Sequence, residues 1–202
     1  MPAIIIGFLS RRSPISSEPS SRIPIDPNYR YSWYARLFFA NQRRRYGKEL
    51  EPARLWARTP KVFAALSLLY GALDRRRSPI EAALRSLITV RVSQINWCAF
   101  CVDINSATGM KRGISEEQLA ALPEFETSPH FDERQKAALA YAEAITRTDV
   151  GVDDALMVRV KACFDDNAVI ELTALIAFQN MSSKFNSALD VAPQGFCRLP
   201  QK

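Results

Sequence analysis

The chain has 202 residues, of which 48% are hydrophobic and 24% are charged. This composition is ample for a packed core in one domain or two small ones, and it excludes a disordered chain. Seven glycines are few for this length, β-branched alternation is rare, and Ala/Leu-rich stretches recur. Together these features predict an all-α protein.

The net charge of +6 is unevenly distributed, because residues 1–77 carry 15 Lys/Arg and only 5 Asp/Glu. A basic region can attract nucleic acid or an anionic surface. No nucleic-acid-binding motif accompanies the clusters at 43–45 and 75–77, so we interpret them as solvated helix ends. We therefore predict no nucleic-acid partner.

The cellular location follows from what the first residues and the cysteines lack. The apolar run near the start has no basic residue before it, and Arg11 and Arg12 follow it, which is the wrong order for a secretory signal. No stretch approaches the ~20 apolar residues needed to cross a bilayer. Four cysteines in a chain of this length do not form a disulfide scaffold. We predict a cytoplasmic protein without a membrane span.

Residues 1–30 are rich in Pro, Ser and Arg, which predicts an extended or disordered arm. A single all-α domain is expected over residues 31–193, followed by a tail at 194–202. The first helix is expected over 31–46 and should stop at Gly47. It could pack on its own domain, on a partner subunit or on a membrane surface.

Further helices follow from apolar periodicity and from capping residues. Ser78 is expected to cap one helix, with Pro79 in its first turn, and Ser115 and Gln118 form a capping box that opens another. The predicted helices after the first span 60–73, 78–95, 98 to about 111, 115–122, 132–148, 153–164 and 166–189, the last with a break near 181–183.

A faint internal repeat appears at an offset of 85 residues. Phe100 lies over Phe185, while Cys98 and Cys101 lie over Ser183 and Asn186. The match predicts two related helical units, roughly 60–113 and 132–190, of which only the first carries thiols.

Cys98 and Cys101 are the most informative residues, because two thiols three positions apart share one helix face. They can exchange between a dithiol and a disulfide with little backbone movement. At a helix start, the N-terminal dipole stabilises a thiolate, which is the competent nucleophile. We expect both sulfurs to be exposed at the mouth of a helical bundle, where reactants can reach them.

The segment 84–113, LRSLITVRVSQINWCAFCVDINSATGMKRG, resembles the carboxymuconolactone decarboxylase-like superfamily, in particular its alkyl hydroperoxidase D-like branch. The resemblance extends over roughly residues 30–193. No nucleotide-binding motif occurs in the sequence, and we expect no cofactor. The resemblance implies an all-α bundle that forms a homo-oligomer. It also implies a peroxidase or disulfide reductase that uses an external thiol reductant. By the resemblance, Cys101 attacks the hydroperoxide and Cys98 resolves the sulfenic acid.

Two positions depart from the family's motif. The family's Glu before the first cysteine is Ser86 here, and its His after the second cysteine is Asn105. Ser and Asn can donate a hydrogen bond or hold a water molecule, but neither is a base near neutral pH.

Four other charged residues are candidates to replace the missing Glu and His beside the thiols. Glu171 could approach the core through the repeat, or be a satisfied helix carboxylate. Arg91 could favour a thiolate, or form an ion pair. Asp103 should point away from Cys101, and Glu81 lies far upstream.

Other interpretations stay open at this point. A lyase of the family's decarboxylase branch, or a non-catalytic or redox-sensing oligomer, would also fit the chain. Zinc is not expected, since a second close ligand pair is missing and His130, the only histidine, reads as a surface residue. Trp97 and Phe100 beside the thiols could line a small apolar pocket or belong to the core.

Overall fold

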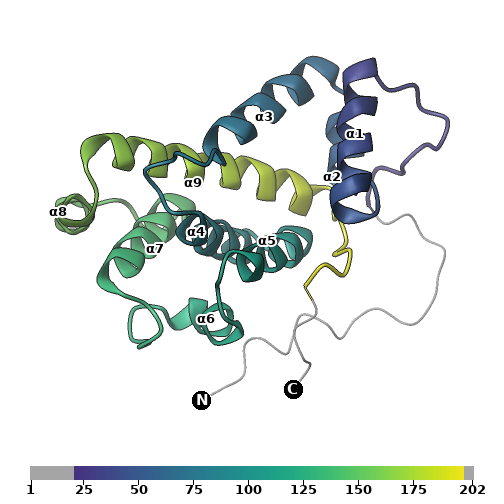
Figure 1. Cartoon of the computed structure of the whole chain (residues 1–202). Coiled ribbons are helices and arrows are strands. Elements are labelled where there is room, and N and C mark those ends of the chain that lie inside the picture. The colour runs from purple at the N-terminus through teal and green to yellow at the C-terminus, as the bar shows by residue number, and fades with distance from the viewer. Residues whose placement is uncertain (1–20, 198–202) are drawn as a thin grey trace.

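In a computed structural model, residues 21–197 are described and form nine α-helices, one 3-10 helix and no strand. The all-α prediction is therefore confirmed for this part of the chain. The elements are α1 (Trp33–Tyr46), α2 (Glu51–Trp56), α3 (Pro60–Leu73), α4 (Ala82–Ile95), α5 (Ala99–Lys111), α6 (Glu116–Ala121), η2 (Leu122–Glu124), α7 (Glu133–Thr146), α8 (Asp154–Cys163) and α9 (Asp166–Ala188). Figure 1 shows α4, α5 and α7 in the middle, with α9 running from the α8 side toward α1 and α2.

The main hydrophobic core lies where α4 contacts α7 and α9. Leu87 and Ile88 of α4 are fully buried there against Leu172 and Ile176 of α9. Burial of each such side chain contributes about 1.5–3 kcal/mol. This core makes α4 the fixed element from which α5 and its cysteines are positioned.

A second, smaller core joins the N-terminal helices to the start of α5. Its buried members include Phe39 of α1, Leu55 of α2, Phe63 of α3 and both cysteines of the CxxC motif. Trp56 of α2 stacks on Phe185 of α9 with ring centroids 3.7 Å apart. The N-terminal helices therefore cover the cysteine end of α5.

Several helix ends are set by local chemistry, and two of them, at Gly47 and at the Ser115 capping box, are predicted from the sequence. Gly47 ends α1 with a φ of 74°, a left-handed conformation that costs glycine little. Ser115 and Asp132 form capping boxes with the glutamine three residues later, at the starts of α6 and α7. Asp153 and Asp165 cap α8 and α9 in the same region of sequence that the periodicity indicates.

Two local predictions are wrong, and one helix was missed. Ser78 does not cap α4, because its hydroxyl accepts from the Ile80 amide and donates to Glu171, so the chain turns and the helix begins at Ala82 after the N-cap Glu81. The break expected near 181–183 is absent, since Ser183 bonds back to the Gln179 carbonyl within a continuous α9. The short helix α2 was not predicted from its sequence.

The two ends of the described chain pack beside the helices. The Arg22 amide donates to the Leu189 carbonyl at 2.8 Å, which ties the start of the described chain to the end of α9. Residues 1–20 and 198–202 lie outside the described range, and with them most of the predicted arm and part of the predicted tail. Among residues 21–197, no helix is both long and apolar enough to cross a membrane.

Candidate functional site

The CxxC motif sits at the start of α5, where the chain turns out of α4. Trp97 adopts a left-handed φ of 56°, a strained conformation for a bulky residue that costs about 1–2 kcal/mol. Asn96 fixes this turn to α9, since its side-chain amide donates to Asn180 at 2.9 Å and to Ser183 at 2.8 Å. The strain is thus held in place directly before the first cysteine.

Cys98 is the N-cap of α5, and its sulfur accepts the Cys101 amide N–H at 3.1 Å. Cys98 and Cys101 form a disulfide across a Cα–Cα distance of 5.2 Å. The pairing shows that the spacing places the two sulfurs within bonding distance. The free helix amides also give the Cys98 sulfur a partner for negative charge when the bond is reduced.

The expectation that both sulfurs are exposed at the mouth of a bundle is wrong. Cys98 is only 2% exposed and Cys101 only 3%, because α1, α2 and α9 pack over the start of α5. Cys101 nevertheless lines a cavity of about 270 Å³, whereas Cys98 does not. Of the two cysteines, only Cys101 therefore borders this cavity.

One stripe of α5 forms the floor of the cavity. Five residues at helical spacing line it from the first turn of α5 to the residue after its end: Cys101, Ile104, Asn105, Thr108 and Arg112. The remaining walls come from both hydrophobic cores, and their aromatic rings are those of Phe38, Tyr46, Trp56, Phe63, Tyr70, Phe100 and Phe178. We call this space the CxxC cavity.

Asn186 of α9 is the polar group at the sulfur. Its side-chain Nδ2 donates to Cys101 Sγ at 3.2 Å, and the residue is only 2% exposed. Its Oδ1 is buried and has no hydrogen-bond partner among residues 21–197. A buried acceptor without a protein donor costs free energy unless a water molecule or a ligand donates to it.

The two positions where the family's motif differs also face the cavity. Ser86 and Asn105 both line it, so the fold brings them into one space with Cys101. The Asn105 amide lies 3.5 Å from Ser93 Oγ, which also accepts from Gln179 at 2.8 Å. Asn105 thus belongs to a network of neutral polar groups that lies beside the thiols.

Ser86 is buried where α4 crosses α5 closely. A Cβ on Gly109 would lie 2.8 Å from Ile114 Cδ1 and 3.4 Å from the Ser86 Cβ, so the glycine makes room for the Ile114 side chain beside Ser86. Ser86 Oγ donates to the Ala82 carbonyl at 3.2 Å and accepts from the Arg112 guanidinium at 3.2 Å. A cation therefore occupies the surroundings of the position where the family has a carboxylate.

Asp74 supplies the carboxylate of the CxxC cavity, but two guanidinium groups hold it. Arg112 binds both of its oxygens, at 2.7 and 2.9 Å, and Arg85 binds one of them at 3.2 Å. With its oxygens engaged in this way, Asp74 is poorly placed to take a proton from a thiol.

Glu171 does not replace the family's carboxylate. Its oxygens accept from Arg75 and Ser78, each at 2.5 Å, and it does not line the CxxC cavity. Burial alone would raise the pKa of Glu171, but these hydrogen bonds and the charges of Arg75 and Arg85 outweigh it, so the pKa is lowered. Glu171 is a satisfied helix carboxylate, one of the two alternatives considered.

The three other candidate charged residues also bind partners other than the cysteine sulfurs. Arg91 forms an ion pair with Glu143, which matches the ion-pair alternative. Asp103 accepts two backbone amides of the C-terminal segment, and Glu81 pairs with Arg134 at 3.3 Å. Phe100 is buried and lines the cavity, so it is both core and wall, whereas Trp97 is 67% exposed.

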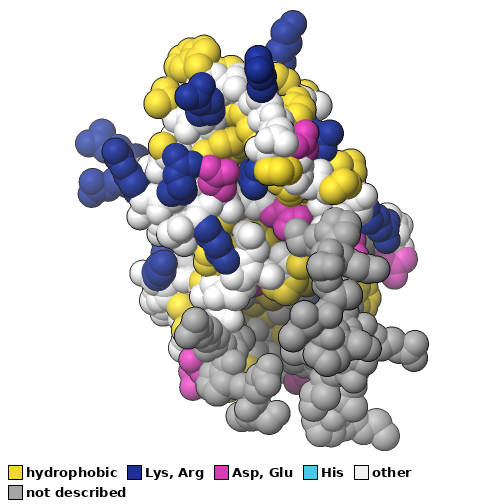
Figure 2. All heavy atoms as spheres, turned by 90° about the vertical axis from the view of Figure 1, so that its right-hand side faces the viewer, with side chains coloured by type: hydrophobic (Ala, Val, Ile, Leu, Met, Phe, Trp, Pro, Cys, Tyr) yellow, Lys and Arg dark blue, Asp and Glu magenta, His cyan; other side chains and the backbone are white. Residues whose placement is uncertain are grey.

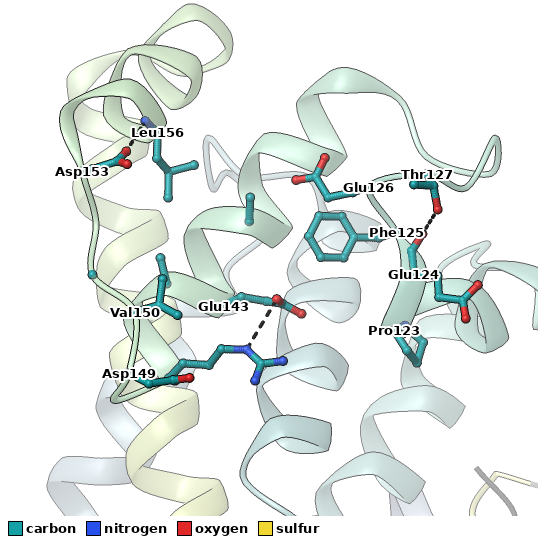
Figure 3. A pocket seen from close by; sticks show the side chains of 14 residues that line it. Pro123, Glu124, Phe125, Glu126, Thr127, Glu143, Asp149, Val150, Asp153 and Leu156 are labelled. Atoms are coloured by element: carbon teal, nitrogen blue, oxygen red, sulfur yellow. Dashed lines mark hydrogen bonds and ion pairs between the residues drawn. The ribbon is translucent and has the colours of Figure 1, made fainter. Parts of the chain in front are cut away.

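A larger pocket, of about 570 Å³, lies away from the cysteines between the loop after α6, α7 and the α7–α8 loop. Figure 3 shows carboxylates around it, including Glu124, Glu126 and Glu143. These groups are used structurally, since Glu143 pairs with Arg147 at 3.6 Å and Asp153 caps the Leu156 amide at 2.8 Å. Although this pocket is larger than the CxxC cavity, no cysteine lines it, and the carboxylates of Glu143 and Asp153 already have partners. No cluster of metal-ligating side chains occurs within the described range.

Comparison with known proteins decides the family. Residues 60–144 match the model of the carboxymuconolactone decarboxylase family. The uncharacterized protein YnjA of Escherichia coli is 46% identical over 160 residues, which cover 79% of this chain and 88% of YnjA. The chain belongs to the carboxymuconolactone decarboxylase family.

Solved structures show that this family member has the alkyl hydroperoxidase D-like fold. An uncharacterized peroxidase-related protein from Silicibacter superposes with a TM-score of 0.79 at 19% identity, over 90% of this chain and 96% of that protein. A peroxidase-related protein from Ralstonia eutropha, described as an AhpD core, has a TM-score of 0.76 at 21% identity, over 89% and 96% of the two chains. At these identities the likeness establishes the fold.

Asn186 is the residue of this family member's site that sequence reasoning missed. A signal was present, since Asn186 falls at the register of Cys101 in the 85-residue offset, the same separation that their hydrogen bond spans. The cavity walls from α1 and α2 had no such signal, because nothing in their sequence indicates that they cover α5.

Proposed function

We propose that this protein is a thiol-dependent oxidoreductase that reduces hydroperoxides through Cys98 and Cys101. The observation that carries the proposal is the position of the disulfide-linked pair at the start of α5, with only Cys101 facing the CxxC cavity. The family and the fold support it. A single reactive sulfur in a walled cavity suits a reaction with a small molecule.

In the oxidative half-reaction, the Cys101 thiolate attacks the terminal oxygen of a hydroperoxide. An S–O bond forms, the O–O bond breaks, and the departing alkoxide takes a proton from water to become an alcohol. The Cys98 thiolate then attacks Cys101 Sγ and forms the disulfide, and the released hydroxide is protonated to water. Two electrons pass from the dithiol to the peroxide.

In the reductive half-reaction, a thiolate of an external dithiol attacks Cys101 Sγ through the same cavity. Cys98 leaves as a thiolate, which the Cys101 amide N–H can stabilise because it already lies 3.1 Å from the Cys98 sulfur. The second thiol of the reductant then breaks the mixed disulfide. The reductant is oxidised and both cysteines return to the reduced state.

Thiolate formation proceeds here without a histidine or glutamate at the motif. The groups that favour negative charge on sulfur are the amides at the α5 N-terminus and the Asn186 side chain. Neither accepts a proton, so the thiol proton goes to solvent. The rate of peroxide reduction should therefore rise with pH as the thiolate fraction grows.

The test separates the two cysteines. Cys101→Ser should abolish hydroperoxide consumption, whereas Cys98→Ser should react once and leave a sulfenic acid that a dimedone-type reagent traps.

In the wild type, mass spectrometry of the peptide spanning residues 97–102 should show the loss of two hydrogens that accompanies disulfide formation. Cys163→Ser, which changes a cysteine outside the pair, is the control and should behave as wild type. Full peroxide consumption by Cys101→Ser would overturn the assignment.

Redox sensing without turnover is the second candidate function. The low exposure of both sulfurs and the neutral residues at Ser86 and Asn105 favour it. A sensor would form the disulfide once with a stoichiometric oxidant and would not consume further peroxide when a dithiol reductant is added. The same assay with and without reductant therefore decides between the two candidates.

The family resemblance also implies a homo-oligomer, and the surface of α3 supports this part of the proposal. Val62 and Leu68 are 50% and 76% exposed on that helix, and Leu69 beside them is also exposed. Exposed apolar side chains grouped on one helix face are typical of a surface that another subunit covers.

A further inference from the structure

We propose that the CxxC cavity takes an elongated apolar hydroperoxide that carries a carboxylate at the end remote from the peroxide. The hydroperoxide part of this inference rests on the proposed function. The carboxylate part rests on charges, distances and wall composition at the two ends of α5.

The cavity is long because a whole face of α5 lines it. Cys101 lies in the first turn of α5 and Arg112 directly follows the helix, eleven positions later. At 1.5 Å per residue this separation is about 16 Å along the helix axis. Between them the walls are mostly aromatic and aliphatic, which suits an apolar chain or ring system rather than hydrogen peroxide alone.

The end away from Cys101 is cationic. Arg45, Arg85 and Arg112 line the cavity, and Asp74 is the one carboxylate among the lining residues. Arg85 and Arg112 both bind Asp74, which leaves excess positive charge. Within the described chain Arg45 has no carboxylate partner, and its guanidinium lies 5.4 Å from the centre of the Tyr46 ring. It is therefore available to an anion.

Tyr70 adds a neutral hydrogen-bond donor at this end. Burial raises the pKa of Tyr70, Asp74 and Tyr46 raise it further, and Arg45 and Arg112 only partly oppose the rise. The phenol therefore stays protonated at neutral pH and can donate to a carboxylate oxygen. Tyr70 lines the cavity close enough to Arg45 and Arg112 for their charges to act on its hydroxyl.

The charge of the surface over α1 and α2 also favours an acidic ligand. Figure 2 shows the face on which α1 and α2 lie, where Lys and Arg side chains outnumber Asp and Glu over the upper part. Positive potential around a cavity raises the local concentration of anions and their association rate. The excess positive charge of residues 1–77 would thus attract an anionic ligand to the cavity instead of a nucleic acid.

The decisive experiment uses decanoate and methyl decanoate, which differ in charge, titrated calorimetrically into the oxidised full-length protein. Decanoate should bind about two- to fivefold more tightly than the ester, as expected for one partly exposed ion pair. Arg45→Gln should remove that preference. Arg44→Gln, which alters a neighbouring arginine outside the cavity, should keep it. Equal binding of acid and ester, or equal losses in both variants, would overturn the inference.

A second arm compares the rates of reduction of a medium-chain hydroperoxy acid and its methyl ester. A preference for the acid that Arg45→Gln abolishes supports the whole inference. Turnover without such a preference refutes the carboxylate end and leaves the peroxidase function standing. Selective decanoate binding with no turnover of either hydroperoxide refutes the peroxidase function and leaves the acid site standing.

A separate observation assigns a role to Asn186. Its Nδ2 contacts Cys101 Sγ at 3.2 Å, while its Oδ1 is buried without a donor and the residue lines the CxxC cavity. A hydroperoxide has one O–H donor, on the oxygen that the thiolate attacks. The geometry points to Asn186 as a catalytic residue that binds this O–H through Oδ1 while Nδ2 stabilises the thiolate.

Asn186→Ala should lower the rate of sulfenic acid formation in the Cys98→Ser background by about tenfold or more, the value of a hydrogen bond to a charged group. It should also lower the thiolate fraction at neutral pH, read by ultraviolet absorbance. Ser187→Ala is the control and should change neither quantity, because it removes only a hydroxyl that donates to the Trp97 carbonyl at 3.4 Å.

If Asn186→Ala fails to fold, Asn186→Asp tests the same point, since a carboxylate beside sulfur should disfavour the thiolate. A wild-type rate and thiolate fraction in a folded variant would exclude the role.

Discussion

Asn105 stands where the family's motif has a histidine, and the cavity around it determines what that difference does. The side chain is half-buried, lines the CxxC cavity and lies one helical turn after Cys101. Its amide donates toward Ser93 Oγ at 3.5 Å, so it contributes polarity and no proton acceptor for a thiol. The chain therefore combines the redox pair with neutral neighbours.

Replacement of Asn105 by His should restore a proton acceptor beside the thiol. We expect Asn105→His to raise the rate of peroxide reduction at neutral pH by about a hundredfold, the lower end of the range for general-base catalysis. The rate should also depend less on pH between the histidine and thiol ionisations. Stopped-flow rates across pH would measure both effects. Asn105→Gln is the matched control, and an equal gain in that variant would show that basicity is not the cause.

At the scale of elements, Asp103 joins α5 to the C-terminal segment. The buried carboxylate accepts the backbone amides of Gln194 and Cys197, each at 2.7 Å. Its loss would leave two amides without partners. Asp103→Ala should therefore lower the free energy of unfolding by about 2 kcal/mol, measured by urea denaturation. Asp149→Ala, at an exposed site without such bonds, should change it by less than about 0.5 kcal/mol.

Glu171 joins α9 to the segment between α3 and α4, and this contact should depend on pH. Because its pKa in the folded protein is lowered, the ionised form stabilises the fold above the unfolded-state pKa. That contribution is lost as pH falls through the folded-state pKa. Glu171→Gln should cost about 1 kcal/mol at neutral pH and should weaken the fall in stability on acidification. Thermal unfolding from neutral to acidic pH would measure this. An unchanged acid profile would exclude Glu171 as a contributor.

At the scale of the whole molecule, the exposed apolar side chains of α3 predict self-association. Leu68→Glu should shift the protein toward smaller species in analytical ultracentrifugation, because a charge would have to be buried in the contact. Val158→Glu makes the same change at a 70% exposed residue of α8 and should leave the assembly intact. A wild-type protein that sediments as a monomer would refute the prediction.

Much of the architecture could be predicted because helix positions depend on short-range chemistry. Gly47, the capping box at Ser115, and apolar residues at helical spacing each act within a few positions of the chain. The wrong predictions arise where a long-range contact overrides the local chemistry. Ser78 is a good local cap, yet Glu171, 93 residues away, takes its hydroxyl. The internal repeat stays a prediction.

The sequence by itself determined the fold class, the family and the cysteine pair, because helix periodicity, helix capping and the CxxC spacing are local properties of the chain. Tertiary structure alone decided that both sulfurs are buried, that only Cys101 faces a cavity, and that Asn186 lies against it. These outcomes depend on how α1, α2 and α9 pack over the start of α5. Such packing is a balance of many long-range contacts, which no short stretch of the chain encodes.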